Sequence, residues 1–313
     1  MKTFLEVFPD LHIAENVRGL LEMVGIEKIS TNRDRSVIRV YIDSPRLMHK
    51  QSIYDLEKGI KDKIALFCNV PQSHVLQNLD VEYLYEAPLA MEKEHLAQVA
   101  CECLHLGCPE PDLTDWKKMV EDLRHPTDEV QVALVGKYVS LHDAYISVVE
   151  ALKHGGITNH ATVHIKWIDS ETVTSENVEE LLGDCNGVLV PGGFGSRGIE
   201  GKILAIQYAR THGIPFLGLC LGMQLTIVEY ARNVIGYTDA HSVELDPNTT
   251  HPVIALMPDQ NGVEDIGGTL RLGAYPCVLD KDSRAYQLYG QENISERHRH
   301  RYEVNNDYRA VLT

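Results

Sequence analysis

The sequence has little that would point to a membrane or a nucleic-acid partner. Its 313 residues include no apolar run of about 18 residues, the length needed to cross a bilayer, and no signal peptide follows Met1. A formal net charge of -16 disfavours nucleic-acid binding by bulk electrostatics. The seven cysteines are odd in number and lack paired spacing, which disfavours a disulfide framework. We therefore expect a cytoplasmic protein.

Two binding motifs are also missing. The phosphate-binding pattern G-x-x-x-x-G-K-[ST] does not occur, because Ser196 stands where the first glycine before Gly201-Lys202 belongs. Cysteine and histidine side chains gather at 101, 103, 105 and 108, but no second half of a zinc motif follows them. The sequence therefore predicts neither a phosphate loop nor a metal site.

The most informative motif is Gly218-Leu219-Cys220-Leu221-Gly222, which follows a short apolar run at 214–217 and opens a helical pattern. A cysteine at a sharp strand-to-helix turn is presented to solvent, and glycines on both sides give such a turn room. The helix N-terminus favours the thiolate. Cys220 is therefore predicted to be a nucleophile and the most readily alkylated cysteine. Cys68 and Cys185, near apolar strand patterns, are expected to be protected.

A second glycine cluster follows another short apolar strand at 187–190. Its sequence is Pro191-Gly192-Gly193-Phe194-Gly195, and backbone N–H groups in such a turn can converge as an oxyanion hole requires. The overlapping stretch 193–198 also matches the dinucleotide fingerprint G-x-G-x-x-G. Nicotinamide binding is nevertheless disfavoured, because Pro191 precedes the fingerprint, the helical pattern starts only near Gly201, and no acid ends the next strand.

From Val130 onward, strand and helix patterns alternate. Strands are predicted at 132–135, 163–168, 188–190 and 214–217, and helices at 145–152 and 202–210. This order is typical of an α/β domain with a doubly wound, mostly parallel sheet, whose site lies at the carboxyl ends of the strands. We expect a smaller α/β piece at the N-terminus.

Several motifs together resemble the CTP synthase family and its class I glutamine amidotransferase domain, which is flavodoxin-like. They are the segments 191–195, 218–224, 241–244, 257–260, 267–273 and 297–305, together with 63–71 and 85–89 upstream. The resemblance runs from about Gly59 to the last residue. It implies ATP-dependent amination of UTP to CTP with ammonia from glutamine. It also implies Mg²⁺ at the ATP site, GTP as allosteric activator, and a homotetramer.

The resemblance assigns roles to individual residues. Cys220 would attack the glutamine amide, and the backbone amides of Gly193 and Leu221 would hold the oxyanion. The glutamine-binding residues would be Gly193, Leu221, Gly222, Met223, Gln224, Glu244 and Arg301. Arg197 and Arg271 are candidates for the GTP effector, since their permanent charge and planar fork suit a phosphate. A solvated surface arginine is the alternative for each.

The upstream part would contribute to nucleotide binding. The resemblance assigns Lys63 to the pyrimidine nucleotide and the stretch Leu79, Asp80 and Val81 to ATP. Leu79 stands where a basic residue is common in the family, which weakens that assignment. Because the phosphate loop is missing, we expect no conversion of UTP to CTP by this chain alone, even with free ammonia.

Four segments are predicted along the chain. They are a small α/β segment at 1–58, a remnant of the amidoligase domain at 59–106, a Pro- and charge-rich linker at 107–129, and the amidotransferase domain at 130–313. Residues 4–9, 37–42 and 45–50 resemble the opening of a PolC-type bacterial DNA polymerase. A chimeric chain and a divergent natural N-terminal module are both open readings of this segment.

The expected catalytic set is incomplete. Cysteine amidotransferases pair the nucleophile with a histidine and a carboxylate, which the family carries on a His-x-Glu motif. No such motif occurs in residues 130–313, and His298 and His300 border the expected glutamine pocket without being assigned as substitutes. We therefore expect a truncated chain with negligible glutaminase activity. The alternatives are a catalytically dead pseudo-amidotransferase, a chimera without intact activity, or a polymerase-linked assembly module.

Overall fold

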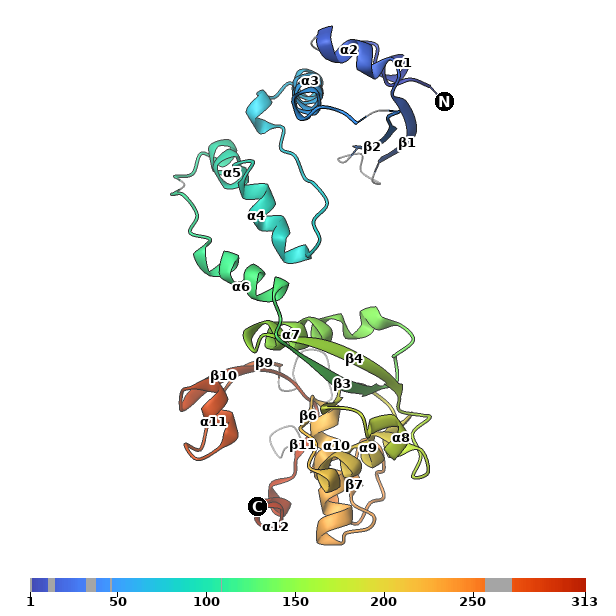
Figure 1. The fold of residues 1–313 in the computed structure, drawn as a ribbon. Helices are drawn as coiled ribbons and strands as arrows, with labels where there is room; N and C mark the ends of the chain where they lie inside the picture. Colours follow the sequence, from blue (N-terminus) through green and yellow to red (C-terminus); the bar gives the residue numbers. More distant parts are fainter. Residues whose placement is uncertain (1, 11–14, 32–37, 46, 108, 257–271) are drawn as a thin grey trace. The chain divides into compact units, whose positions relative to one another are not determined.

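The computed structural model describes residues 2–10, 15–31, 38–45, 47–107, 109–256 and 272–313 (Figure 1). The chain folds into two compact units, Met1–Val120 and Glu121–Thr313. They are described separately.

The first unit opens with a small α/β arrangement. Helices α1 (Phe4–Val7) and α2 (Glu15–Leu21) precede an antiparallel pair, β1 (Gly25–Thr31) and β2 (Ile38–Asp43), and the long helix α3 (Lys50–Cys68). Thr3 caps α1: its hydroxyl accepts from the Glu6 N–H, and the Glu6 carboxylate accepts from the Thr3 N–H. The core of this arrangement consists of Phe4, Val17, Leu21, Val24, Ile26 and Leu56.

Short helices make up the rest of the first unit. Single 3₁₀ turns at Gln72–His74 and Leu84–Glu86 lead to α4 (Ala87–Glu92) and α5 (Leu96–Leu104). Helix α6 (Thr114–Arg124) follows, inside the segment 107–129 for which a linker was predicted. Trp116 on α6 donates its indole N–H to the Tyr85 carbonyl at 2.7 Å, and the two rings meet edge to face. The start of α6 is therefore attached to the first unit.

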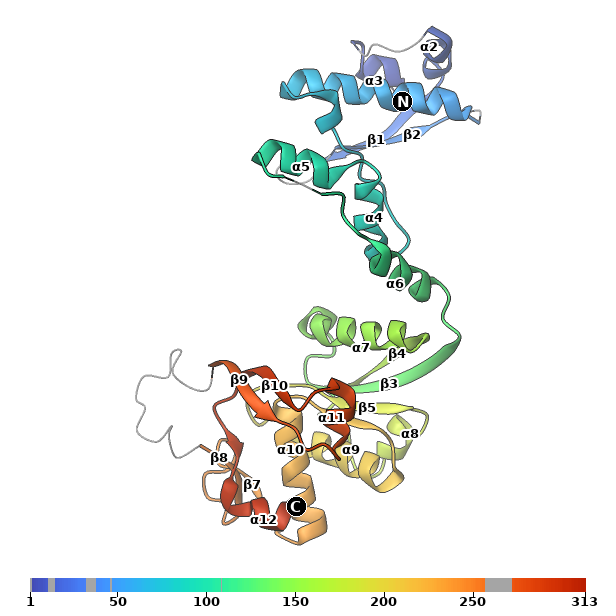
Figure 2. The ribbon, with the colours of Figure 1, turned by 90° about the vertical axis from the view of Figure 1, so that its left-hand side faces the viewer.

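A four-stranded parallel sheet is the frame of the second unit (Figures 1 and 2). Its strands are β3 (Asp128–Gly136), β4 (Ala161–Asp169), β5 (Gly187–Val190) and β6 (Phe216–Gly218), in the order β4-β3-β5-β6. The chain thus starts near the middle of the sheet and winds outward in both directions. This confirms the predicted doubly wound fold, and the four predicted strands all exist, the last shifted slightly toward Cys220.

Helices cover both faces of this sheet (Figure 2). On one face, α7 (Ile146–Thr158) packs over a cluster that contains Leu134 and Leu189. On the other face, α8 (Val178–Leu182), α9 (Ile199–His212) and α10 (Leu221–Tyr230) cover the larger core, which contains Ala133, Val135, Val188 and Val190. In the second half of β3 and in β5, successive residues point alternately to these two clusters, which explains why residues 132–135 and 188–190 are all apolar.

The strands β7 (His241–Ser242), β8 (Pro252–Ala255) and β11 (Glu303–Val304) in the C-terminal part of the chain contact α10. They form a small sheet of order β11-β8-β7. β9 (Leu272–Val278) and β10 (Asn293–Arg299) form an antiparallel pair with α11 (Arg284–Tyr289) between them, and α12 (Arg309–Leu312) follows β11. Asn305 binds β8 through its backbone N–H to the Val253 carbonyl at 2.9 Å. Residues 300–305 are thereby held beside the nucleophile helix. No helix among the described residues is long and apolar enough to span a bilayer.

Candidate active site

Cys220 occupies a strained turn between β6 and α10. It is the N-cap of α10 with φ 55° and ψ -108°, a positive-φ conformation that residues with a side chain rarely adopt. The two flanking glycines are required by close approach. A Cβ on Gly218 would lie 2.6 Å from the Gly222 carbonyl carbon, and one on Gly222 would lie 2.0 Å from the Val190 oxygen. The backbone around Cys220 therefore forms the sharp strand-to-helix turn that the sequence predicts.

The glycine-rich turn after β5 packs directly against this elbow. A Cβ on Gly192 would lie 3.3 Å from the Cys220 Cβ, and one on Gly193 would lie 3.8 Å from the Leu221 Cδ2. Leu221 opens α10, so its backbone N–H belongs to the first turn, whose donors have no partner within the helix. The two backbone amides assigned to the oxyanion hole thus come from neighbouring segments beside the cysteine.

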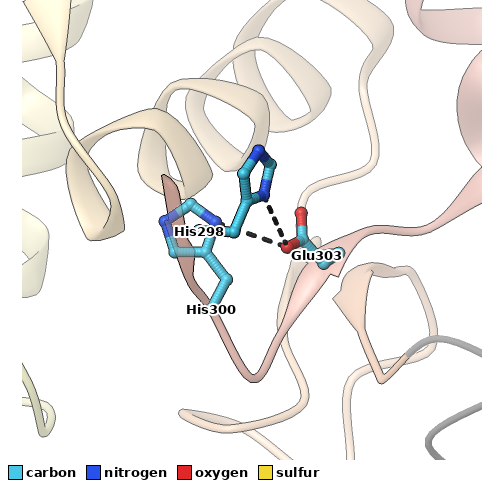
Figure 3. A group of neighbouring side chains, drawn as sticks. All are labelled: His298, His300 and Glu303. Atoms are coloured by element: carbon cyan, nitrogen blue, oxygen red, sulfur yellow. Dashed lines mark ion pairs between the residues drawn. The ribbon is translucent and has the colours of Figure 1, made fainter. Parts of the chain in front are cut away.

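His300 and Glu303 are the functional candidates that the sequence analysis missed. His300 lies beside Cys220. Its Nδ1 lies 3.3 Å from the Glu303 Oε1 (Figure 3). The contact with Cys220 and the contact with Glu303 raise the pKa of His300 to about 10, in that order of importance and against the effect of burial. Here the structure differs from the expectation that neither His298 nor His300 replaces the missing histidine. The chain brings a cysteine, a histidine and a carboxylate together.

The residues assigned to glutamine binding are only partly brought together. Gln224 is buried, and its side-chain amide donates to the Tyr302 carbonyl at 2.8 Å, which attaches α10 to the segment before β11. Arg301 is exposed, with its guanidinium over the Tyr302 ring at 5.4 Å. Glu244 is exposed beyond β7, and its backbone N–H donates to the Ser242 hydroxyl at 3.3 Å. Met223 is half-buried in the first turn of α10.

A cluster of three cations surrounds the glycine-rich turn. Arg197 pairs with Glu171 at 2.7 Å and donates to the Lys137 carbonyl at 3.2 Å, while the Lys137 ammonium hydrogen bonds to the Phe194 carbonyl. Lys202 is fully buried, and its ammonium group has no hydrogen-bond partner among the described residues. Burial, then Lys137 and Arg197, lower the pKa of Lys202 to about 8. Arg271, the other residue assigned to GTP, lies outside the described residues.

The residues assigned to nucleotides in the first unit do not form a cradle for phosphates. Lys63 reaches the Asp10 carbonyl at 3.4 Å and lies over the Phe67 ring. Leu79 is exposed, and Asp80 pairs with Arg39 at 3.7 Å. Val81 follows in the same loop. Lys63 is the one cation of this predicted set.

The described cysteines differ in exposure. Cys185 is buried, and burial followed by the nearby Asp184 raises the pKa of its thiol, in agreement with the expected protection. Cys68 is exposed, so its expected protection is wrong. Residues 63–68 form the last turns of α3 instead of a strand, and the apolar run faces outward at that helix end. Cys220 is half-buried at its turn.

Comparison with known proteins agrees with this geometry. The model of glutamine amidotransferase class-I matches residues 140–312, more than half of the chain. The chain therefore belongs to the class-I glutamine amidotransferase family. Relatives of the chain include CTP synthases, and the model described as CTP synthase N-terminus matches residues 30–106. This second match starts inside the segment 1–58. The resemblance of that segment to a polymerase stays a prediction.

Individual relatives give the same result. The chain is 55% identical over 259 residues to a CTP synthase of Clostridium beijerinckii and 56% identical over 268 residues to one of Clostridium perfringens. These matches take in 83% and 86% of the chain but 48% and 50% of the relatives, so the chain spans about half their length. A solved glutaminase domain of Trypanosoma brucei CTPS with bound acivicin matches with a TM-score of 0.54 and 39% identity, covering 58% of this chain and 71% of that one.

Proposed function

We propose that this chain hydrolyses the side-chain amide of glutamine at Cys220 and so releases ammonia. The observation that carries the proposal is the position of Cys220 at the N-terminus of α10, in contact with His300. A cysteine nucleophile needs a group that takes and returns a proton, and His300 is within reach of it. The Glu303 Oε1 lies 3.3 Å from the His300 Nδ1, and Glu303 would orient the ring.

The reaction follows from these contacts. The Cys220 thiol gives its proton to His300 while its sulfur attacks the amide carbon, and the amides of Gly193 and Leu221 stabilise the oxyanion. The C–N bond then breaks while His300 gives a proton to the leaving nitrogen, so that ammonia departs and a thioester remains. Water, whose proton passes to His300, attacks the thioester carbon. Glutamate leaves and the Cys220 sulfur regains its proton.

A second group of residues would bind the amino-acid end of glutamine. Gln224, Glu244, Met223, Gly222 and Arg301 are proposed to hold the amino acid's charged end, with Arg301 pairing with its carboxylate. Because Gln224 donates to the Tyr302 carbonyl, it would also hold the turn that carries Arg301 in position.

We also propose that GTP acts at the cation cluster beside the glycine-rich turn. Arg197, Lys137 and Lys202 give three positive charges in one place, and the charge of Lys202 is not balanced by any described partner. A triphosphate would supply that balance. In a glutaminase assay, GTP should raise the rate in the wild-type chain and fail to do so in Arg197→Met. Glu171→Gln, which frees Arg197 without removing its charge, should keep the response.

Amination of UTP with ATP and Mg²⁺ is proposed for the whole protein, of which the chain spans about half, in a cytoplasmic homotetramer. The residues assigned to ATP, Leu79, Asp80 and Val81, do not fit a magnesium–triphosphate group, because they include no cation and Asp80 pairs with Arg39. No step of that reaction is assigned to this chain.

Release of ammonia from glutamine, measured with metal-free protein, tests the proposed hydrolysis. The wild-type chain should release ammonia and glutamate in equal amounts, and Cys220→Ser should release neither. Equal release by both chains would place the activity elsewhere or in a contaminant.

A further inference from the structure

We propose that His298, His300 and Glu303 form a binding site for a zinc ion beside Cys220. These three side chains offer two imidazole nitrogens and one carboxylate oxygen, all within 4.8 Å of one another (Figure 3). This donor set suits Zn²⁺, whereas Mg²⁺ and Ca²⁺ prefer oxygen ligands throughout. The sequence analysis predicted no metal site here.

The distances between the donors are close to those around a zinc ion. Zinc–nitrogen and zinc–oxygen bonds of about 2.1 Å in a tetrahedron separate neighbouring donors by about 3.4 Å. The Glu303 Oε1 lies 3.3 Å from the His300 Nδ1 and 3.9 Å from the His298 Nδ1. The two imidazole nitrogens lie within 4.8 Å of each other, so the donors would move inward to meet one ion.

Two chain segments fix this arrangement. His298 lies near the end of β10, two residues before His300, and its ring packs on Tyr275 of β9 with the centroids 5.3 Å apart. Glu303 begins β11 and pairs with Ala255 of β8. The three donors thus stand on a short return of the chain that strand pairing holds at both ends, which favours a preformed site over one assembled by the ion.

His298 has no part in the proposed hydrolysis, yet its Nδ1 is buried and makes no hydrogen bond among the described residues. A buried donor or acceptor without a partner is costly, and a metal ion would satisfy it. Because His300 also contacts Cys220, a fourth ligand of the kind that zinc prefers, a thiolate, lies next to the three.

Bound zinc would stop glutamine hydrolysis. It would occupy the His300 nitrogen and the Glu303 oxygen that face each other in the proposed catalytic arrangement, and it would lie beside the nucleophile. This consequence rests on the proposed function. The metal site itself does not.

Metal binding to the full chain tests the site directly. Zinc is titrated into reduced, metal-free protein against a chromophoric chelator, and cobalt is titrated separately to record its visible absorption. His298→Gln should bind one zinc ion fewer than the wild type, or bind it at least about 100-fold more weakly, and should lose the cobalt absorption. Glu303→Gln should weaken binding in the same direction. His212→Gln, an exposed histidine on α9, should bind as the wild type does.

Circular dichroism and thermal melting establish that each variant is folded. Unchanged stoichiometry and affinity in folded His298→Gln and Glu303→Gln would overturn the proposal, because zinc would then be bound by other groups. An absence of tight binding to the wild type would overturn it as well. Each variant's glutaminase activity is compared with and without zinc. Zinc should inhibit the wild type reversibly, and inhibition should need about 100-fold more zinc in His298→Gln. If the metal-free wild type releases no ammonia, the proposed function fails while the binding result still decides the metal site.

Discussion

The backbone of Gly222 lies so close to that of Val190 that a Cβ atom on Gly222 would be 2.0 Å from the Val190 carbonyl oxygen. This contact joins the first turn of the nucleophile helix α10 to the end of β5, where the glycine-rich turn begins. It therefore determines how the proposed oxyanion donors sit relative to Cys220.

Gly222→Ala should destabilise the second unit and disturb the elbow. The methyl group collides with backbone, which cannot move aside as a flexible side chain can, so we expect a loss of about 2–3 kcal/mol. Chemical denaturation measures the loss. Gly155→Ala in α7 is the matched control, because nothing lies within 4 Å of its Cβ and alanine favours a helix. That variant should be as stable as the wild type or slightly more so. Equal stability of both variants would show that the predicted backbone contact is absent.

Cysteine labelling tests the elbow independently. Iodoacetamide should modify Cys220 faster than the other cysteines, because it lies at a helix N-terminus in contact with His300. Cys185 should react slowest, since it is buried and its thiol pKa is raised. Peptide mapping over time gives the order, and glutamine should slow the labelling of Cys220 alone. Faster labelling of Cys101 or Cys277 would be incompatible with the assignment of the nucleophile.

The buried Lys202 should make stability depend on pH. Its folded pKa of about 8 lies below the ordinary 10.5, so the folded state disfavours the proton and the penalty is fully present below pH 8. The penalty decreases as the pH rises from about 8 to 10.5, because the folded protein loses the proton before the unfolded chain does. Lys202→Met should thus be about 2–3 kcal/mol more stable than the wild type at pH 7, and this gain should shrink toward pH 10.

Denaturation at pH 7 and pH 10 measures that difference, with each variant compared to the wild type at the same pH. Lys281→Met is the control, because Lys281 is exposed and pairs with Glu292 at the surface. Its difference from the wild type should be small at both pH values. A Lys202→Met variant that is less stable than the wild type at pH 7 would mean that a partner balances the charge of Lys202 in solution.

The sequence predicted the frame of the second unit well because the relevant signals are local. Apolar runs of strand length alternate with helical patterns, and the glycines around Cys220 mark the elbow within five residues. The prediction that Cys68 is protected was wrong, and it too was based on a local pattern. An apolar run such as 64–68 is compatible with a helix or a strand, and its length does not separate the two.

The partners of Cys220 could not be found by local reasoning. The family carries its histidine and carboxylate at the spacing His-x-Glu, whereas His300 and Glu303 are separated by two residues in the turn between β10 and β11. Nothing in the sequence near Cys220 reports that this return packs against α10. That arrangement depends on the pairing of β11 with β8 and on the hydrogen bond between Gln224 and Tyr302. The one feature of the sequence that could have indicated these partners is the His-x-x-Glu pattern formed by His300 and Glu303.

The joint action of Cys220 and His300 on glutamine is tested most directly by the rate at which Cys220 is acylated. A diazoketone analogue of glutamine is added to metal-free wild type, His300→Gln, Glu303→Gln and His212→Gln, and modification of Cys220 is followed by mass spectrometry. We predict that His300→Gln reacts about 100-fold more slowly than the wild type, Glu303→Gln about tenfold more slowly, and His212→Gln at the wild-type rate. A folded His300→Gln chain that modifies Cys220 as fast as the wild type would contradict the proposed catalytic role of His300.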